Sequence, residues 1–470
     1  DLRGDMKRFS VLALALVFLF TGCESATWME ELEEGKETII AEIKEIKSMV
    51  IEERQEDWEK ILAYGSKEFF GGHPADEAFL YYLTAEYGPE LMESVAELDE
   101  LKNPQIWHNA FGKSIHVLWY EYCKATGVQS FEMQNIHEYD CASDDEIVLD
   151  FIGDYSVAEG IGTTVYMDNQ INGITDCFSD ELLTELHSAD IFVVNNEFTY
   201  TKSNNPIEGK AYTFKANPGR VDLLGEIGVD LACVANNHVF DFHEEGLLDT
   251  LETLDDYGMI HIGAGKNIEE ASRPAYFIVG GYKIAVVNAT QIERSLNYTQ
   301  EATKTDPGVF KCLKPEAFNK AIKKAKANSD FCIVYVHWGT EGNLNYGPDQ
   351  EALARGFVES GADAIIGGHT HCLQTVEFMD DVPIYYSLGN FFFSITGAMP
   401  EDYATCIAQL RIKDGELGAY FLPCYFSAGQ IYLLDADDDR YTDILVGLNN
   451  ISDTAFIDYS GRLTKQQSEE

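Results

Sequence analysis

Beyond about residue 146, short hydrophobic runs alternate with longer segments of helical periodicity. The runs predict strands, and the segments between them predict helices. The predicted strands are Ile147–Gly153, Ile191–Val194, Asp230–Ala235, Phe331–Val336 and Asp363–Ile366. The predicted helices are Asp180–His187, Arg220–Ile227, Glu244–Tyr257, Pro315–Ala327 and Pro348–Ser360. This alternation indicates an α/β domain with parallel strands.

Two further pairs of runs predict antiparallel hairpins. Ala275–Val279 and Tyr282–Asn288 flank Gly280-Gly281, and Thr405–Ile412 and Leu417–Pro423 flank Asp414-Gly415. Both dipeptides favour tight hairpin turns. The pattern therefore predicts an α/β domain over residues 146–425, followed by an acidic, Asn- and Asp-rich extension over residues 426–470.

Residues 24–145 are predicted to form a mainly α-helical region, either a stalk or a small domain. Hydrophobic residues recur there at helical spacing, first at Leu32, Ile39, Ile43, Ile46 and Val50, and later at Trp107, Phe111, Ile115, Leu118 and Tyr122. An aromatic stripe of this kind is typical of a packed core. The region contains no motif with a recognisable chemistry.

The first 23 residues have the pattern of an export signal. Met6-Lys7-Arg8 precedes an apolar run, Phe9–Phe20, which is followed by Thr21-Gly22-Cys23. A run of this length is short for a membrane span. Its end resembles a bacterial lipoprotein signal, in which Cys23 would be lipidated; an uncleaved membrane anchor is the alternative. Both predict that the rest of the chain lies on the extracellular face of the cytoplasmic membrane, attached to it through its N-terminus.

The charge of the chain restricts its partners. The 470 residues contain 33 Lys and Arg against 80 Asp and Glu, a net charge of −47. Such a surface repels phosphate backbones at long range, so no nucleic-acid partner is expected. Solubility in high salt is an alternative reason for the acidity.

Polar residues follow five of the apolar runs. Asp154, Asn195-Asn196-Glu197, Asn236-Asn237-His238, His337 and His369-Thr370-His371 each come directly after a predicted strand. Sites in open α/β sheets form beyond the carboxyl ends of the strands, so these residues are expected to converge. Taken singly, each has a structural alternative: a turn, a buried histidine, a cap, or an ion pair of Glu197 with Lys202 or Lys210.

The candidate ligands predict a metal centre. They are Asp154, Glu197, Asn237, His337, His369 and His371. Oxygen and imidazole donors without a thiolate suit divalent Mn, Fe, Zn or Mg. Six ligands exceed the needs of one tetrahedral ion, so two ions are expected, with Glu197 as a possible bridge. His238 is the candidate catalytic residue, and Asp241 either orients it or caps the following helix.

The same blocks resemble the CapA family of poly-γ-glutamate capsule biosynthesis proteins, within the calcineurin-like metallophosphoesterase superfamily. The blocks are Asn236-Asn237-His238 through Asp241, His337-Trp338-Gly339-Thr340-Glu341, Gly368-His369-Thr370-His371, and Tyr386-Ser387-Leu388-Gly389-Asn390-Phe391. The resemblance implies a four-layer α/β/β/α sandwich, metal ligands at Asn237, His337, His369 and His371, and a catalytic role for His238. Asn236, Glu341 and Asn390 are expected to line the substrate pocket.

The chain departs from the superfamily pattern at its first ligand block. Asp154-Tyr155-Ser156 places a serine where phosphoesterases usually have a histidine, and Asn196-Glu197 replaces the usual Gly-Asp pair. One metal position therefore has fewer strong ligands, and phosphatase activity does not follow from the fold.

Three functions remain open from the sequence. The first is biosynthesis, export or anchoring of poly-γ-glutamate, with the polymer and a capsule synthase complex as partners. The second is hydrolysis of an extracellular phosphate ester by a two-metal phosphoesterase. The third is a non-catalytic, metal-dependent binding module. Whether the protein is an enzyme therefore stays open.

Overall fold

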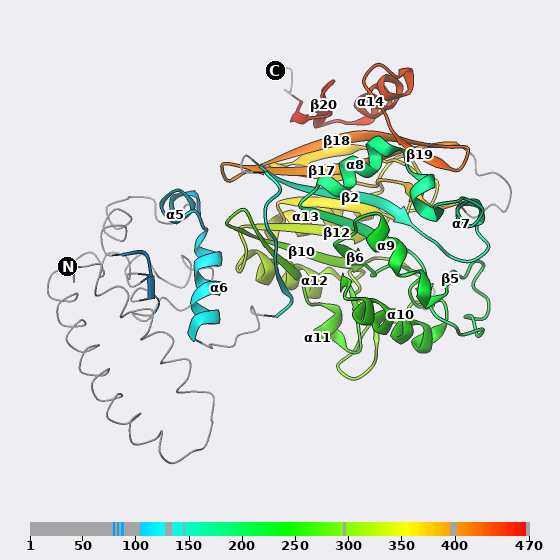
Figure 1. Ribbon diagram of the computed structural model, residues 1–470, viewed down its shortest axis with the longest axis horizontal. Helices are drawn as coiled ribbons and strands as arrows, with labels where there is room; N and C mark the ends of the chain where they lie inside the picture. Colours follow the sequence, from blue (N-terminus) through cyan, green and yellow to red (C-terminus); the bar gives the residue numbers. More distant parts are fainter. Residues whose placement is uncertain are drawn as a thin grey trace, which may run out of the picture. The chain divides into compact units, whose positions relative to one another are not determined.

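The computed structural model describes residues 79, 82–83, 86–88, 104–126, 134–143, 146–294, 298–394 and 402–466 (Figure 1). The predicted signal segment with Cys23 and the helical stripe from Leu32 to Val50 lie outside these residues. The chain divides into two compact units, one of residues 1–134 with 281–283 and one of residues 135–280 with 284–470. None of the helices in the described residues combines the length and the hydropathy of a membrane span.

The first unit contains helices α5 (Pro104–Phe111) and α6 (Ile115–Thr126). Gly112 separates them with a positive φ of 67°, which glycine adopts readily, so the aromatic stripe lies on two helices and not on one. Trp107 and Leu118 are fully buried, and the ring of Phe79 meets that of Trp119 edge-on at 5.2 Å. The stripe is therefore a packed core.

In the second unit, eight strands of the described chain form one sheet. Its order is β19-β18-β17-β2-β3-β6-β7, with β16 also paired to β2. The strands are β2 (Ile147–Tyr155), β3 (Ile191–Asn196), β6 (Leu231–Cys233), β7 (Ile260–Ile262), β16 (Asn390–Phe392), β17 (Tyr403–Lys413), β18 (Glu416–Ser427) and β19 (Gln430–Leu433). Strands β2, β3, β6 and β7 run parallel, as the alternation of strands and helices predicts.

The other large sheet contains seven strands within the described residues, in the order β1-β9-β10-β12-β13-β15-β14. They are β1 (Ile136–Glu138), β9 (Ala275–Val279), β10 (Tyr282–Thr290), β12 (Phe331–His337), β13 (Ala364–Gly368), β14 (Val376–Met379) and β15 (Val382–Tyr385). Strands β10, β12 and β13 are parallel neighbours.

The two sheets pack face to face between outer layers of helices (Figure 1). The hydroxyl of Tyr335 on β12 donates to the carbonyl of Ile152 on β2 at 2.9 Å, which joins the inner faces. Outside the eight-stranded sheet lie α8 (Asp180–Ser188), α9 (Asp222–Glu226) and α10 (His243–Tyr257); outside the other lie α12 (Pro315–Lys326) and α13 (Pro348–Glu359). The expected α/β/β/α architecture is confirmed.

Alternation along single strands explains this layering. On β12, Cys332, Val334 and Val336 pack in the core with α12 and α13. Tyr335 points to the opposite face, where it meets β2. Successive side chains of a strand point to opposite faces, and a strand buried on both faces reads as a continuous hydrophobic run.

The remaining elements connect or extend these layers. They are α7 (Gly162–Met167), the 3-10 turns Gly173–Cys177 and Pro218–Arg220, β4 (Thr199–Tyr200), β5 (Lys215–Ala216), β8 (Ala264–Gly265), α11 (Ile268–Ala271), β11 (Gly308–Val309), α14 (Asp439–Ile451), β20 (Ala455–Ile457) and β21 (Leu463–Lys465).

Two parts of the structure differ from the expected boundaries. The boundary after Tyr425 falls inside β18, and the acidic segment beyond it forms β19, α14, β20 and β21. At the other end, β1 lies in the stretch expected to be helical and pairs in parallel with β9. Edge strands as short as β1 carry too few residues for a period-2 pattern to identify.

Candidate metal centre

The polar residues that follow the strands meet at one edge of the sandwich. Asp154 pairs with Asn195 in the register of β2 and β3, and His337 pairs with Gly368 in that of β12 and β13. The first pair comes from one sheet and the second from the other. Because the sheets pack face to face, the carboxyl ends of all four strands lie at the same edge.

One group of donors contains Glu197, His337 and His369, all buried. Each offers a ligand atom, and the three atoms lie within 4.8 Å of one another. His337 Nε2 is 3.4 Å from Glu197 Oε1, and the rings of His337 and His369 are 4.7 Å apart. Among the residues that the structure describes, no hydrogen-bond partner reaches either buried oxygen of Glu197 or the buried Nδ1 of His369.

A second group contains Asp154, Glu197 and His371 and shares Glu197 with the first. In this group Asp154 and His371 are held by contacts within the protein. His371 Nδ1 lies 3.1 Å from Asp154 Oδ2 and 2.8 Å from Asn390 Oδ1. Asp154 also accepts from the backbone amide of His369, at 3.2 Å to each oxygen. A third group adds the exposed Glu341 to His369 and His371.

The backbone after β13 is shaped to bring its histidines onto Asp154. His369 and His371 have positive φ angles of 93° and 60°, which non-glycine residues seldom adopt. A Cβ atom at Gly368 would stand 2.9 Å from Asp154 Oδ1, so this position needs a glycine for the strand to approach the carboxylate. The Gly368-His369-Thr370-His371 motif thus supplies both the backbone conformation and the ligand side chains of this part of the site.

Asn195 links the two groups, a role that the sequence did not assign to it. Its amide donates to Asp154 Oδ1 at 2.8 Å and lies 3.1 Å from His337 Nδ1. His337 Nε2 in turn lies 2.6 Å from Oδ1 of Asn237. The only signal in the sequence was the position of Asn195 beside Glu197 after its strand.

The environment sets the charge of each histidine. Burial lowers the pKa of His337 to about 3, and it holds the pKa of His369 well below its usual value. For His371 burial also opposes the charged form, but the hydrogen bond and charge of Asp154 outweigh it and raise the pKa. Burial alone would raise the pKa of Asp154, and its contacts with His371 lower it instead. Neutral imidazoles at His337 and His369 are the form that binds metals.

The surroundings of the Glu197 carboxyl group show whether these residues suit a bound cation. Burial, followed by the charge of Asp154, raises the pKa of Glu197 well above its usual value. A buried carboxylate without hydrogen bonds costs several kcal/mol unless a proton or a cation compensates it. Together with the unpartnered Nδ1 of His369, this oxygen and nitrogen set fits a divalent metal ion.

His238 stands beside the donors with a partner of its own. Its Nδ1 lies 2.8 Å from Asp241 Oδ2, and Asp241 Oδ1 accepts from Lys210 Nζ at 2.6 Å. Lys210 also donates to the carbonyl of Asn237 and lies 3.6 Å from Glu293. Asp241 therefore orients the imidazole of His238 and does not cap the following helix. Lys210, which the sequence offered as an ion-pair partner of Glu197, pairs instead with Asp241. Its role beside His238 was not expected from the sequence.

The expected pocket residues have different surroundings. Asn236 is buried and holds its turn together: it donates to the carbonyl of Asn196 at 2.8 Å and accepts from the amide of His238 at 3.0 Å. Asn390 reaches the centre because β16 pairs with β2 opposite Asp154. Ser156, which occupies the usual histidine position, is buried and accepts from the amide of Ala158 at 3.3 Å.

Comparison with known proteins identifies the same region. The sequence profile of the family described as "Bacterial capsule synthesis protein PGA_cap" matches residues 148–394, which contain every candidate ligand. The chain is 32% identical over 217 residues to the capsule biosynthesis protein CapA of Bacillus anthracis, covering 45% of this chain and 51% of that relative. It is 29% identical over 282 residues to the PGA biosynthesis protein CapA of Bacillus subtilis (strain 168), covering 59% and 71%.

A third relative has a related name. It is a probable polyglutamine synthesis accessory protein of Mycobacterium tuberculosis (strain ATCC 25618 / H37Rv), 28% identical over 210 residues, with 43% of this chain and 55% of that protein covered. The chain thus spans about half of the length of the Bacillus anthracis and Mycobacterium relatives. The matches support the family and the fold.

Proposed function

This chain belongs to the bacterial capsule synthesis protein family PGA_cap, and we propose that it acts in the biosynthesis, export or anchoring of a poly-γ-glutamate polymer. The names of the two Bacillus relatives support a role in capsule or PGA biosynthesis. The structural observation that carries the proposal is the buried cluster of Glu197, His337 and His369. In the described structure the two carboxylate oxygens of Glu197 have no hydrogen-bond partner.

We propose that this cluster holds two divalent ions of Mn, Fe, Zn or Mg. Glu197, Asn237, His337 and His369 would hold the first. Asp154, Glu197 and His371 would hold the second, and Glu197 would be shared between them. Such ions, when bound, polarise a carbonyl or phosphoryl oxygen and stabilise negative charge.

The chain itself would position the substrate and move protons. Asp241 accepts the hydrogen bond of His238 Nδ1 and so fixes the tautomer, which leaves Nε2 to exchange a proton with the substrate. Burial lowers the pKa of His238, so its imidazole is neutral at physiological pH and suited to accept that proton. Lys210 holds Asp241 in place.

A polyanionic substrate needs local positive charge on so acidic a protein. Lys210 and Arg294 are basic residues near the candidate centre, but carboxylates face both of them: Asp241 and Glu293 face Lys210, and Asp349 faces Arg294. Lys210 lies against Asn237 and Asp241, and Arg294 donates to Gly339 and, at 3.3 Å, to Thr340, just after His337. Bound cations at the centre would therefore offset most of the repulsion between the chain and glutamate carboxylates.

The location is part of the same proposal. The Thr21-Gly22-Cys23 sequence after an apolar run supports a lipid anchor at Cys23 and a position on the extracellular face of the cytoplasmic membrane. A capsule synthase complex in that membrane would be the partner.

Complementation tests the proposal. A Bacillus strain without its own CapA would receive the full chain, the His369→Ala/His371→Ala variant, or His187→Ala as a matched control on the exposed part of α8. We expect the full chain and the control to restore the cell-associated polymer and the double variant to fail. Absence of polymer with the full chain, despite normal export and folding, would contradict the role, and restoration by the double variant would contradict the metal centre.

The His238–Asp241 pair favours a second candidate, a phosphoesterase that acts on an extracellular ester. An oriented histidine beside a metal cluster is a common arrangement for proton transfer in hydrolysis. Turnover of an aryl phosphate by the purified protein, lost in His238→Ala, would support this function. Metal binding without turnover of ester or polymer would instead identify the site as a binding module.

A further inference from the structure

A cavity lies in the α/β unit, lined by residues other than those of the candidate metal centre. It has a volume of about 370 Å³ and is lined by the end of α10, β7, β8, α11 and residues of β1. None of the proposed metal ligands, nor His238 or Asp241, is among its lining residues. A volume of this size is in the range of small-molecule sites.

Two buried nitrogen atoms in this wall have no hydrogen-bond partner within the described part of the chain. They are Nε of Arg273 and Nδ1 of His261. The other nitrogen of His261, Nε2, lies 2.9 Å from Asp255 Oδ1, so this ring is held in place by its neighbour. Because Asp255 accepts from Nε2, Nδ1 of His261 is the acceptor of this ring, whereas Nε of Arg273 is a donor. A ligand that donates to the first and accepts from the second would satisfy both buried atoms.

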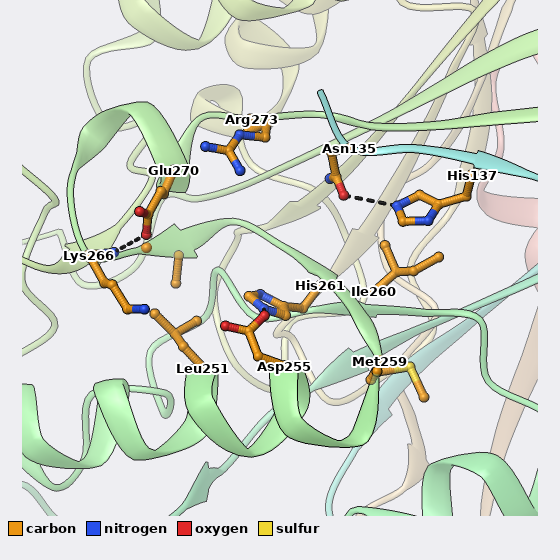
Figure 2. Close-up of a pocket in the computed structure, with 13 residues that line it drawn as sticks. Asn135, His137, Leu251, Asp255, Met259, Ile260, His261, Lys266, Glu270 and Arg273 are labelled. Carbon is orange, nitrogen blue, oxygen red and sulfur yellow. Dashed lines mark hydrogen bonds and ion pairs between the residues drawn. The ribbon is translucent and has the colours of Figure 1, made fainter. Parts of the chain in front are cut away.

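Charges of both signs line the cavity. Lys266 and Arg273 are basic, and Asp255 and Glu270 are acidic. Figure 2 shows Lys266, Glu270 and Arg273 coming from the turn after β8 and from α11, while His261 and Asp255 come from β7 and the end of α10. Glu270 Oε2 accepts from the amide of Lys266 at 2.9 Å.

The apolar part of the wall is small. Leu251, Met259 and Ile260 contribute hydrophobic side chains beside the charged ones (Figure 2). A simple polyanion would meet Asp255 and Glu270 as well as the basic groups. A ligand that carries both a carboxylate and an ammonium group matches both signs and places its methylene groups on the apolar side chains.

We propose that this cavity binds a zwitterionic α-amino acid group, with its carboxylate at Arg273 and Lys266 and its ammonium group at Glu270 and Asp255. Two sources present this chemistry: a free amino acid such as glutamate, and the amino-terminal residue of a γ-linked glutamate chain, which retains its free α-carboxylate. The second source rests on the proposed function; the binding chemistry does not.

Isothermal titration of the purified protein with glutamate and with a γ-linked glutamate trimer tests this site. We expect saturable binding of at least one of them and a loss of about tenfold or more in affinity in Arg273→Gln and in Glu270→Gln. Arg462→Gln, an exposed arginine near the C-terminus, is the matched control and should bind as the unaltered protein does. Lys266→Gln, at an exposed position, provides a second variant if Arg273→Gln does not fold.

Acetylation of the ligand's amino group tests the ammonium half of the proposal. The acetylated ligand should bind at least about tenfold more weakly.

Failure of both ligands to bind, unchanged affinity in Arg273→Gln and Lys266→Gln, or equal binding of the acetylated ligand would overturn the proposal. Binding retained in His369→Ala/His371→Ala would support a cavity independent of the metal centre, and loss of binding in that folded variant would overturn it. Binding of glutamate alone would support the cavity and remove its link to the polymer.

Discussion

The two halves of the candidate centre differ in how far the protein satisfies them by itself. Around Glu197 and His369, three buried atoms lack hydrogen-bond partners among the described residues. Around Asp154 and His371, an ion pair at 3.1 Å and a contact with Asn390 satisfy the donors internally. In the first half the carboxyl group of Glu197 needs a proton or a cation to offset its burial, whereas in the second the Asp154–His371 pair is satisfied within the protein. We therefore expect the half around Glu197 to bind metal more tightly.

The largest expected effect separates these halves directly. His369→Ala removes a ligand from the half around Glu197 and should lower metal affinity by about 100-fold or more, whereas His371→Ala should cost about tenfold or less. Metal analysis after dialysis, and titration of metal into the apo protein, measure both. Equal losses in the two variants would contradict the comparison.

Asn195 is the residue through which the halves are joined. Asn195→Ala removes its contacts with Asp154 and His337 and should lower metal affinity by about tenfold and the free energy of unfolding by about 1–3 kcal/mol. Metal titration and urea unfolding give the two values. Asn205→Ala, at an exposed position, is the control and should change neither. A lower free energy of unfolding with unchanged metal affinity would show that Asn195 does not support metal binding.

The two halves should also respond to pH with opposite signs in the metal-free protein. His337 and His369 have lowered pKa values in the fold, so the unfolded chain takes up protons first and stability falls as the pH drops below about 6.5. His371 has a raised pKa, so its contribution is present below about 6.5 and is lost as the pH rises through its folded value. The lowered pKa of Asp154 confines the contribution of that pair to pH values above about 4.

Thermal unfolding between about pH 4 and 8 in a chelator measures these slopes. His337→Gln should flatten the loss of stability on the acid side, and His371→Gln should flatten the loss on the neutral side. If both substitutions change the same limb of the curve, the assignment of charge to the two halves is wrong.

The smallest effect is expected at the position where the chain departs from phosphoesterases. Ser156 bonds the amide of Ala158, so Ser156→Ala should cost about 1 kcal/mol of stability and leave the metal content unchanged. Metal analysis with urea unfolding measures both quantities. Loss of metal in this variant would show that the serine participates in the second half.

Much of the fold followed from the sequence because buried parallel strands have clear hydrophobic runs. The predicted Phe331–Val336 and Asp180–His187 differ from β12 and α8 by a single residue at one end. The short elements were less predictable. Leu231–Cys233 is the whole of β6 in a predicted run of six residues, and β1 gave no signal, because its three residues become a strand only through pairing with β9.

The site was predictable to the level of which residues meet. The ligand candidates Asp154, Glu197, His337, His369 and His371 all occur in donor groups of the described structure. The sequence did not indicate that Asn195 contacts Asp154 and His337, or that Lys210 contacts Asp241. An asparagine after a strand and a lysine in a loop are usually surface residues. Their roles come from the partners that the fold brings to them.

The sequence by itself determined the order of strands and helices, the family, and the set of donors at the ends of the strands. Only the tertiary structure decided how those donors are satisfied. Asp154 meets Asn195 across 41 residues of chain, Asn195 meets His337 across 142, and Asp154 meets the amide of His369 across 215. Periodicity determines the face and the end of an element on which a side chain lies, but a hydrogen bond requires two atoms to lie within about 3 Å. That distance depends on how the two sheets pack, and so does the lack of partners that makes Glu197 the expected point of metal binding.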